Sequence, residues 1–171
     1  KLEEAEIFTR KAIELKPDYS IAHLNLGNIL SDLGKLEEAE IFTRKAIELD
    51  PVFADAHYSL GIILSDLGKS QDAFDSYLKS IEINPNLSNI YSSITRFLRD
   101  SDLSKLNKSK LQYIINLLLE KNDISHNELI RAFNFLYANE IIIDLEKFDS
   151  DFSKIEILMH YKVIINALKK I

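Results

Sequence analysis

The sequence contains no cysteine and no tryptophan, and it has only three prolines and four glycines in 171 residues. The lack of cysteine excludes disulfide bonds, thiolate metal ligands and a cysteine nucleophile. No apolar run approaches the roughly 18–20 residues that a membrane-spanning helix needs, so we expect no membrane partner. No secretory signal peptide is visible, and we expect a cytoplasmic protein. Because the chain begins at Lys1 in the middle of a repeating pattern, we also expect it to be a piece of a longer protein.

Positive charge is scarce in the first half of the chain. Residues 1–85 contain nine Lys and Arg against sixteen Asp and Glu, whereas residues 86–171 contain twelve against eleven. Binding to a nucleic-acid backbone depends on Lys and Arg that neutralise phosphates, so we expect no nucleic-acid partner. A hydrophobic content of 46% suffices for a substantial core, and 28% charged residues indicate a solvated surface. The sequence does not define an oligomeric state.

In place of these features the sequence has a stretch that occurs twice. Residues 1–34 and 35–68 share their first fifteen letters and differ at eight of 34 positions. The 34-residue interval also separates prolines and glycines, namely Pro17, Pro51 and Pro85, and Gly27 and Gly61. A fixed period between 20 and 50 residues is typical of repeat architectures. Apolar residues recur at helical spacing, so each unit is predicted to be two helices, with Gly34 closing one and Pro51 following the next.

The repeated positions resemble the tetratricopeptide repeat. The two complete copies have His23, Leu26, Gly27, Leu30, Ala39, Thr43 and Pro51, and then His57, Leu60, Gly61, Leu64, Ala73, Tyr77 and Pro85. A third copy begins with Tyr91, Ile94, Thr95 and Leu98, and a preceding half-copy has Ala5, Thr9 and Pro17. The resemblance covers about residues 1–100, and it implies a right-handed superhelical array of antiparallel helix hairpins whose first helices line the concave side. Histidine and threonine replace large aromatic residues of the family pattern at His23 and Thr43, and Thr95 replaces its glycine, which suggests that the array is ending.

We therefore predict an all-α solenoid followed by additional non-repeat helices. The array would occupy residues 1–100, with a partial first unit at 1–19, full units at 20–53 and 54–87, and a degenerate last unit from 88. Residues 101–171 lose the period and are predicted to form a C-terminal helical extension or cap. Its helices are expected at about 108–121, after a capping box at Ser125 and after a second one at Ser153. Ile141–Leu145 is short enough to be a strand or a helical turn.

Motifs for catalysis or metal binding are few. His23 and His57 occupy equivalent positions where the family has a packing residue, and no H-E-x-x-H pattern surrounds them. His126 lies inside a predicted capping box, and His160 lies on a predicted helix with no evident partner. The segment 149–153 resembles the start of a calcium loop, but the required glycine and final glutamate are missing, and helix capping explains the same letters. We expect no catalytic residue, no cofactor and no metal ion in this chain.

The mismatches between the two copies concentrate on one helical stripe. Four of them recur at i, i+3, i+4 and i+7, namely Ile21/Asp55, Leu24/Tyr58, Asn25/Ser59 and Asn28/Ile62. The stripe and its continuation in the last unit predict a peptide-binding groove lined by Ile21, Leu24, Asn25, Asn28, Asp55, Tyr58, Ser59, Ile62, Asn89, Ser92, Ser93 and Arg96. Exposed Ile, Leu and Tyr interleaved with Asn and Ser would suit an extended or helical peptide.

One known mode of peptide binding in the family fits poorly. Some arrays hold a C-terminal carboxylate with Lys, Asn and Arg on the first helices. Here Asn28 matches one of these positions, whereas the other four hold Leu24, Ser59, Asn89 and Ser93. The resemblance therefore disfavours a carboxylate clamp.

The pattern favours a noncatalytic module that binds a peptide or protein segment of unknown identity. An alternative is the substrate-recruiting N-terminal part of a larger bacterial enzyme, of glycosyltransferase or methyltransferase type, whose catalytic domain lies beyond Ile171. A third interpretation is homo-oligomerisation through the repeat end at Lys1–Pro17. Neutral drift of a solvent-facing stripe after a recent duplication would also produce the same mismatches.

Overall fold

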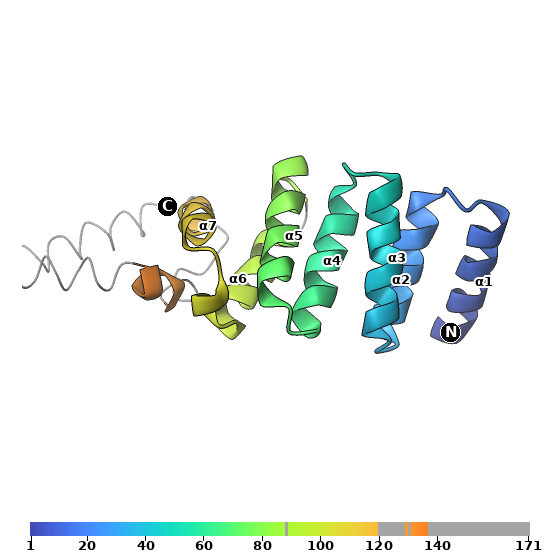
Figure 1. The fold of residues 1–171 in the computed structure, drawn as a ribbon, viewed down its shortest axis with the longest axis horizontal. Helices are drawn as coiled ribbons and strands as arrows, with labels where there is room; N and C mark the ends of the chain where they lie inside the picture. Colours follow the sequence, from blue (N-terminus) through green and yellow to red (C-terminus); the bar gives the residue numbers. More distant parts are fainter. Residues whose placement is uncertain (88, 120–128, 130, 137–171) are drawn as a thin grey trace, which may run out of the picture. The chain divides into compact units, whose positions relative to one another are not determined.

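The computed structural model describes residues 1–87, 89–119, 129 and 131–136, and these residues are built from helices (Figure 1). The elements are α1 (Leu2–Leu15), α2 (Ser20–Asp32), α3 (Leu36–Leu49), α4 (Ala54–Asp66), α5 (Ser70–Ile83), α6 (Ile90–Asp100), a short 3-10 helix η1 (Leu103–Lys105) and α7 (Lys108–Leu119). The chain divides into two units, Lys1–Ile90 and Tyr91–Ile171. The predicted all-α class is confirmed for the described residues, and the predicted boundary near residue 100 stays a prediction.

The first unit is a stack of helix hairpins, in which α2 packs on α3 and α4 packs on α5. Its helices follow one another in chain order along the stack in Figure 1. The helix α2 also contacts α4, so the first helices of successive hairpins are neighbours. This is the arrangement that the 34-residue period predicts.

The turn inside each hairpin is closed by a glycine, as the sequence predicts. Gly34 and Gly68 have φ values of 75° and 73°, a left-handed conformation that glycine adopts without a steric penalty. The amide of Gly34 donates to the carbonyl of Ser31 at 2.9 Å, and the amide of Lys35 donates to Leu30 at 2.9 Å. These two bonds form a Schellman motif, which satisfies carbonyls left free at the end of α2.

Two apolar clusters join the hairpins α2–α3 and α4–α5 of the first unit. One cluster joins α2, α3 and α4 through Leu26, Leu30, Ala39 and Ile63. A second cluster lies beside it and consists of Leu24, Ala46 and Ala56. Because each cluster takes residues from both hairpins, neither hairpin buries its apolar face alone.

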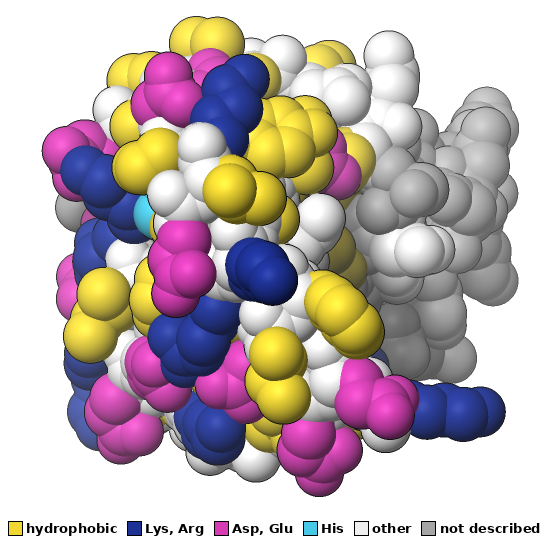
Figure 2. Space-filling view, turned by 90° about the vertical axis from the view of Figure 1, so that its right-hand side faces the viewer, with side chains coloured by type: hydrophobic (Ala, Val, Ile, Leu, Met, Phe, Trp, Pro, Cys, Tyr) yellow, Lys and Arg dark blue, Asp and Glu magenta, His cyan; other side chains and the backbone are white. Residues whose placement is uncertain are grey.

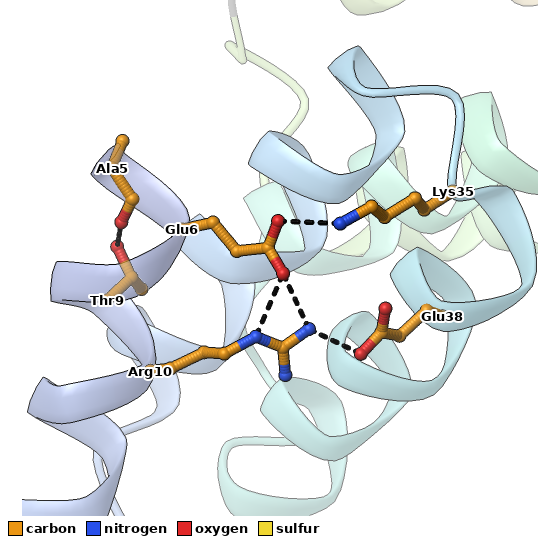
Figure 3. Close-up of polar contacts among 6 residues, drawn as sticks. All are labelled: Ala5, Glu6, Thr9, Arg10, Lys35 and Glu38. Atoms are coloured by element: carbon orange, nitrogen blue, oxygen red, sulfur yellow. Dashed lines mark hydrogen bonds and ion pairs between the residues drawn. The ribbon is translucent and has the colours of Figure 1, made fainter. Parts of the chain in front are cut away.

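Within the first unit, a chain of ion pairs joins the second helix of one repeat to the second helix of the next repeat (Figure 3). Glu6 accepts hydrogen bonds from Lys35 Nζ at 2.8 Å and from Arg10 Nε at 2.9 Å, and Arg10 also donates to Glu38. The bonds from Lys35 and Arg10 hold the pKa of Glu6 below its usual value. The arrangement recurs one repeat later around Glu40.

Glu40 lies between two cations. It accepts from Lys69 Nζ at 2.6 Å and from Arg44 Nε at 2.9 Å, and its side chain is 14% exposed. Burial is the largest single influence and raises the pKa of Glu40, but the two hydrogen bonds together outweigh it and lower the pKa. A carboxylate with a lowered pKa stabilises the folded state above the unfolded pKa, and this stabilisation is lost as the pH falls.

We predict that Glu40→Gln lowers the free energy of unfolding by up to about 1 kcal/mol at pH 7. Because the pKa of Glu40 is lowered in the folded state, this stabilisation begins to be lost below the ordinary value of 4.5, so the difference between the variant and the parent should be smaller at pH 3 than at pH 7. Urea unfolding followed by circular dichroism at the two pH values measures the difference. Glu14→Gln, at an exposed position of α1, is the matched control. A loss that is the same at both pH values would contradict the ion-pair explanation.

The second unit begins with α6, η1 and α7. Asp102 caps η1, because its Oδ1 accepts from the amide of Ser104 at 3.1 Å. Asn107 caps α7 in the same way through a 3.0 Å bond from the amide of Lys110. The helix predicted at about 108–121 thus begins at Lys108, and its described part ends at Leu119. The expected capping boxes at Ser125 and Ser153 and the ambiguous segment 141–145 lie outside the described residues.

The surface at α1 mixes hydrophobic and charged side chains, as Figure 2 shows. The helix α1 has no buried residue, and Ile7, Phe8 and Leu15 are all more than half exposed. Homo-oligomerisation through residues 1–17 stays a prediction. Within the part of the chain that the structure describes, no helix is both long and apolar enough to cross a bilayer.

Candidate functional site

The predicted stripe is held in place by very close contacts between the two helices of each hairpin. A methyl group built on Gly27 would overlap the hydroxyl oxygen of Thr43, and one built on Gly61 would come within 2.7 Å of the ring of Tyr77. These two glycines therefore allow the helices of each hairpin to approach closely. The tight packing fixes which face of α2 and α4 points away from the second helices.

On α2, three of the four predicted groove residues are exposed. Ile21 is 44% exposed, and Asn25 and Asn28 are exposed beside it. The expectation that Leu24 is exposed is wrong. Leu24 is only 5% exposed because it packs against Ala46 and Ala56.

On α4, Asp55 is exposed, and Tyr58, Ser59 and Ile62 are half-buried. The ring of Tyr58 lies 6.2 Å from that of Tyr77, between centroids, with an interplanar angle of 52°. This tilted ring contact with Tyr77 of α5 orients the Tyr58 ring. Together with the exposed residues of α2, these side chains form a surface that alternates apolar area with amide, hydroxyl and carboxylate groups.

The remaining four predicted residues lie at or beyond the boundary of the first unit. Asn89 is exposed and has a φ of 65°, so it precedes α6 instead of lying within a helix as Ile21 and Asp55 do. In the second unit, Ser92 and Arg96 are exposed, whereas Ser93 is 7% exposed. The expectation of an accessible side chain at Ser93 is wrong.

Both histidines of the repeat bind the loop that precedes their own helix. His23 Nε2 lies 2.8 Å from the carbonyl oxygen of Pro17, and His57 Nε2 lies 3.1 Å from that of Pro51. Among the described residues, no group of three or more His, Asp or Glu side chains is placed to hold a metal ion. The calcium-like segment 149–153 and both His126 and His160 lie outside the described residues.

Sequence reasoning missed a pocket of about 440 Å³ between α3 and α5. Ile47 and Leu60 contribute apolar surface to it, and Arg44, His57 and Ser76 lie around them. The signal that could have revealed it is the loss of a large aromatic side chain, since Ser76 stands where the preceding repeat has Phe42.

Comparisons with known proteins agree with the repeat geometry. A tetratricopeptide repeat family model matches residues 20–53 and 54–87, the bounds predicted for the two full units. Among curated proteins, none matches the chain by sequence.

Several solved structures have a similar fold. The first tetratricopeptide domain of Spaghetti, bound to an HSP90 peptide, gives a TM-score of 0.55 at 22% identity, over 57% of this chain and 77% of that chain. A variant of the O-GlcNAc transferase of Thermobaculum terrenum gives 0.59 at 23% identity, over 68% of this chain and 22% of that chain. YrrB, a protein of the same repeat type with an unusual peptide-binding site, gives 0.58 at 24% identity, over 80% and 68% of the respective chains. At these identities the likeness concerns the fold alone.

Proposed function

Because a tetratricopeptide repeat family model matches residues 20–53 and 54–87, we propose that this chain binds an extended or helical segment of a partner protein in the concave groove, on the faces of α2 and α4 that point away from α3 and α5. Repeats of this family are protein-interaction modules. The single observation that supports this location is the exposure of Ile21 on a stripe where the two otherwise near-identical repeats differ. Similar folds are bound to an HSP90 peptide in Spaghetti and described with a peptide-binding site in YrrB.

The surface chemistry limits the kind of peptide that would bind. Ile21 and Tyr58 offer apolar area, and the amides of Asn25 and Asn28 can pair with a peptide backbone. Asp55 adds a negative charge to a half of the chain that is already acidic. We therefore propose a peptide with apolar anchors and a neutral or positive charge. An acidic peptide such as the SRMEEVD segment bound by Spaghetti is disfavoured, in agreement with the incomplete clamp.

The test uses a phage-displayed library of 12-residue peptides selected on the full chain. We predict that the double variant Ile21→Ala, Tyr58→Ala binds the selected peptides at least tenfold more weakly than the parent, because anchor residues at the centre of an interface dominate the binding free energy. Leu24 is excluded from the variant, since its burial would turn a binding test into a stability test. Isothermal titration calorimetry measures the affinity, and circular dichroism checks that helicity is unchanged.

The matched control is Ile41→Ala, which removes the same kind of exposed aliphatic side chain from α3, where Ile41 is 66% exposed. It should leave the affinity within about twofold of the parent. If the selected peptides bound the Ile21 and Tyr58 double variant as tightly as the parent, the groove would not be their binding site. A selection that yielded no binding peptide would also contradict the proposal.

A second candidate function is the recruitment of protein substrates to an attached enzyme. The observation that favours it is the likeness to the Thermobaculum terrenum O-GlcNAc transferase, in which this chain corresponds to only 22% of the length. The gene sequence after the codon for Ile171 decides the matter. A glycosyltransferase or methyltransferase domain there would support the proposal, and an immediate stop codon would remove it.

A further inference from the structure

The pocket between α3 and α5 lies within the first unit and shares no residue with the stripe on α2 and α4. Ile47 of α3 and Leu60 of α4 line it, with Arg44, His57 and Ser76 around them. It is an open depression with a volume of about 440 Å³, and its lining includes both apolar and charged side chains. A variant that changes this pocket therefore leaves the proposed groove intact.

The preceding repeat shows what fits such a space. Six of the eight lining residues have identical counterparts there, including Arg10 for Arg44, Ile13 for Ile47, His23 for His57 and Leu26 for Leu60, whereas Asp75 and Ser76 stand where that repeat has Ile41 and Phe42. The ring of Phe42 stacks on His23 at 6.0 Å between centroids and 24° between planes. The guanidinium carbon of Arg10 lies 5.3 Å from the centroid of the same ring.

We propose that the pocket binds an aromatic side chain of a partner protein, with phenylalanine as the preferred residue. The ring would take the place that Phe42 occupies one repeat earlier. His57 would stack on one side of it, and the Arg44 guanidinium would complement the negative face of the ring. His57 is half-buried, whereas His23 beneath Phe42 is only 5% exposed, so His57 retains surface that a ring can cover.

The charged groups at the pocket favour an aromatic ligand over an ion. Arg44 is paired with Glu40 at 2.9 Å, and Lys79 is paired with Glu82 at 3.1 Å. The Ser76 hydroxyl donates to the carbonyl of Asp72 on its own helix at 2.8 Å. Both signs of charge occur around the pocket, so it has no net attraction for a simple ion, and the apolar floor of Ile47 and Leu60 remains for recognition.

The experiment titrates the ¹⁵N-labelled full chain with N-acetyl-phenylalanine amide and records amide chemical shifts. We expect saturable shifts at residues 44–48, 57–60 and 75–79, with a Kd on the order of millimolar. N-acetyl-leucine amide should bind at least fivefold more weakly. Contacts from the probe ring to the methyl groups of Ile47 and Leu60, seen as intermolecular nuclear Overhauser effects, place the ring in the pocket directly.

Three variants make the test specific. Ser76→Phe fills the pocket with its own ring and should lower the affinity for N-acetyl-phenylalanine amide at least tenfold. Ser76→Ala leaves the pocket open and should bind this probe with the affinity of the parent. Phe42→Ser should open a second pocket and add shifts at residues 10–13 and 23–26. If Ser76→Phe fails to fold, the Overhauser contacts in the parent chain decide. Equal binding of the leucine probe, undiminished binding to a folded Ser76→Phe variant, or the absence of saturable shifts would overturn the proposal.

Discussion

Replacing Leu30 with alanine is expected to lower the free energy of unfolding by about 3 kcal/mol. Leu30 is fully buried in the cluster that joins α2, α3 and α4, beside Leu26, Ala39 and Ile63. The change removes apolar area and leaves a cavity that fixed neighbouring helices cannot fill. Urea unfolding followed by circular dichroism at 222 nm measures the loss as a lower midpoint.

The control for this prediction is Ile41→Ala on α3. Ile41 is 66% exposed, so the same chemical truncation should change stability by no more than about 0.5 kcal/mol. Repeat arrays can unfold in steps, so amide hydrogen exchange should accompany the urea data and show faster exchange in α2, α3 and α4 of the Leu30 variant. Similar losses for both variants would contradict the assigned core.

Features set by local sequence were predictable. The helix ends depend on a residue that must adopt a positive φ or on a proline that cannot continue a helix, and both requirements are visible in the letters. Gly34 closes its turn as expected, and α3 ends at Leu49, two residues before Pro51. The 34-residue period then implies the stacking of hairpins, because equal units repeat equal contacts.

Burial at the edge of the core was harder to predict. Leu24 and Tyr58 occupy the same repeat position, yet Leu24 is buried and Tyr58 is half-buried. The spacing of residues along one helix defines a face of that helix, but it does not indicate which side chains of other helices pack against that face. Leu24 packs against Ala46 and Ala56 from two different helices, and Tyr58 lies against the ring of Tyr77.

The pocket was missed for a related reason. The two near-identical copies end at residue 68, and a comparison of them does not align Phe42 with Ser76. The decisive difference lies in α5, whose sequence departs widely from those of α1 and α3. Its consequence depends on Arg44, Ile47, His57 and Leu60, which come from two other helices.

Replacing Gly27 with alanine is expected to destabilise the protein by about 2 kcal/mol, although the same change stabilises an ordinary exposed helix. Alanine improves helix propensity by about 1 kcal/mol, but overpacking costs about 3 kcal/mol where the neighbours cannot move. The new methyl group would overlap the Thr43 hydroxyl and lie 3.2 Å from the backbone oxygen of Ala39. The backbone contact cannot be relieved by a side-chain rotation, so α2 and α3 would have to separate.

A double-mutant cycle with Thr43→Ala separates the two contacts of Gly27. Removing the hydroxyl should recover about 1 kcal/mol in the Gly27→Ala background, and the backbone contact with Ala39 should retain the rest of the loss. Urea midpoints of the parent, the two single variants and the double variant measure this coupling. If Gly27→Ala instead raised the midpoint, the close approach of α2 and α3 would not be what positions the stripe. The exposed face of α2 that includes Ile21 would then need another explanation, because its orientation follows from that approach.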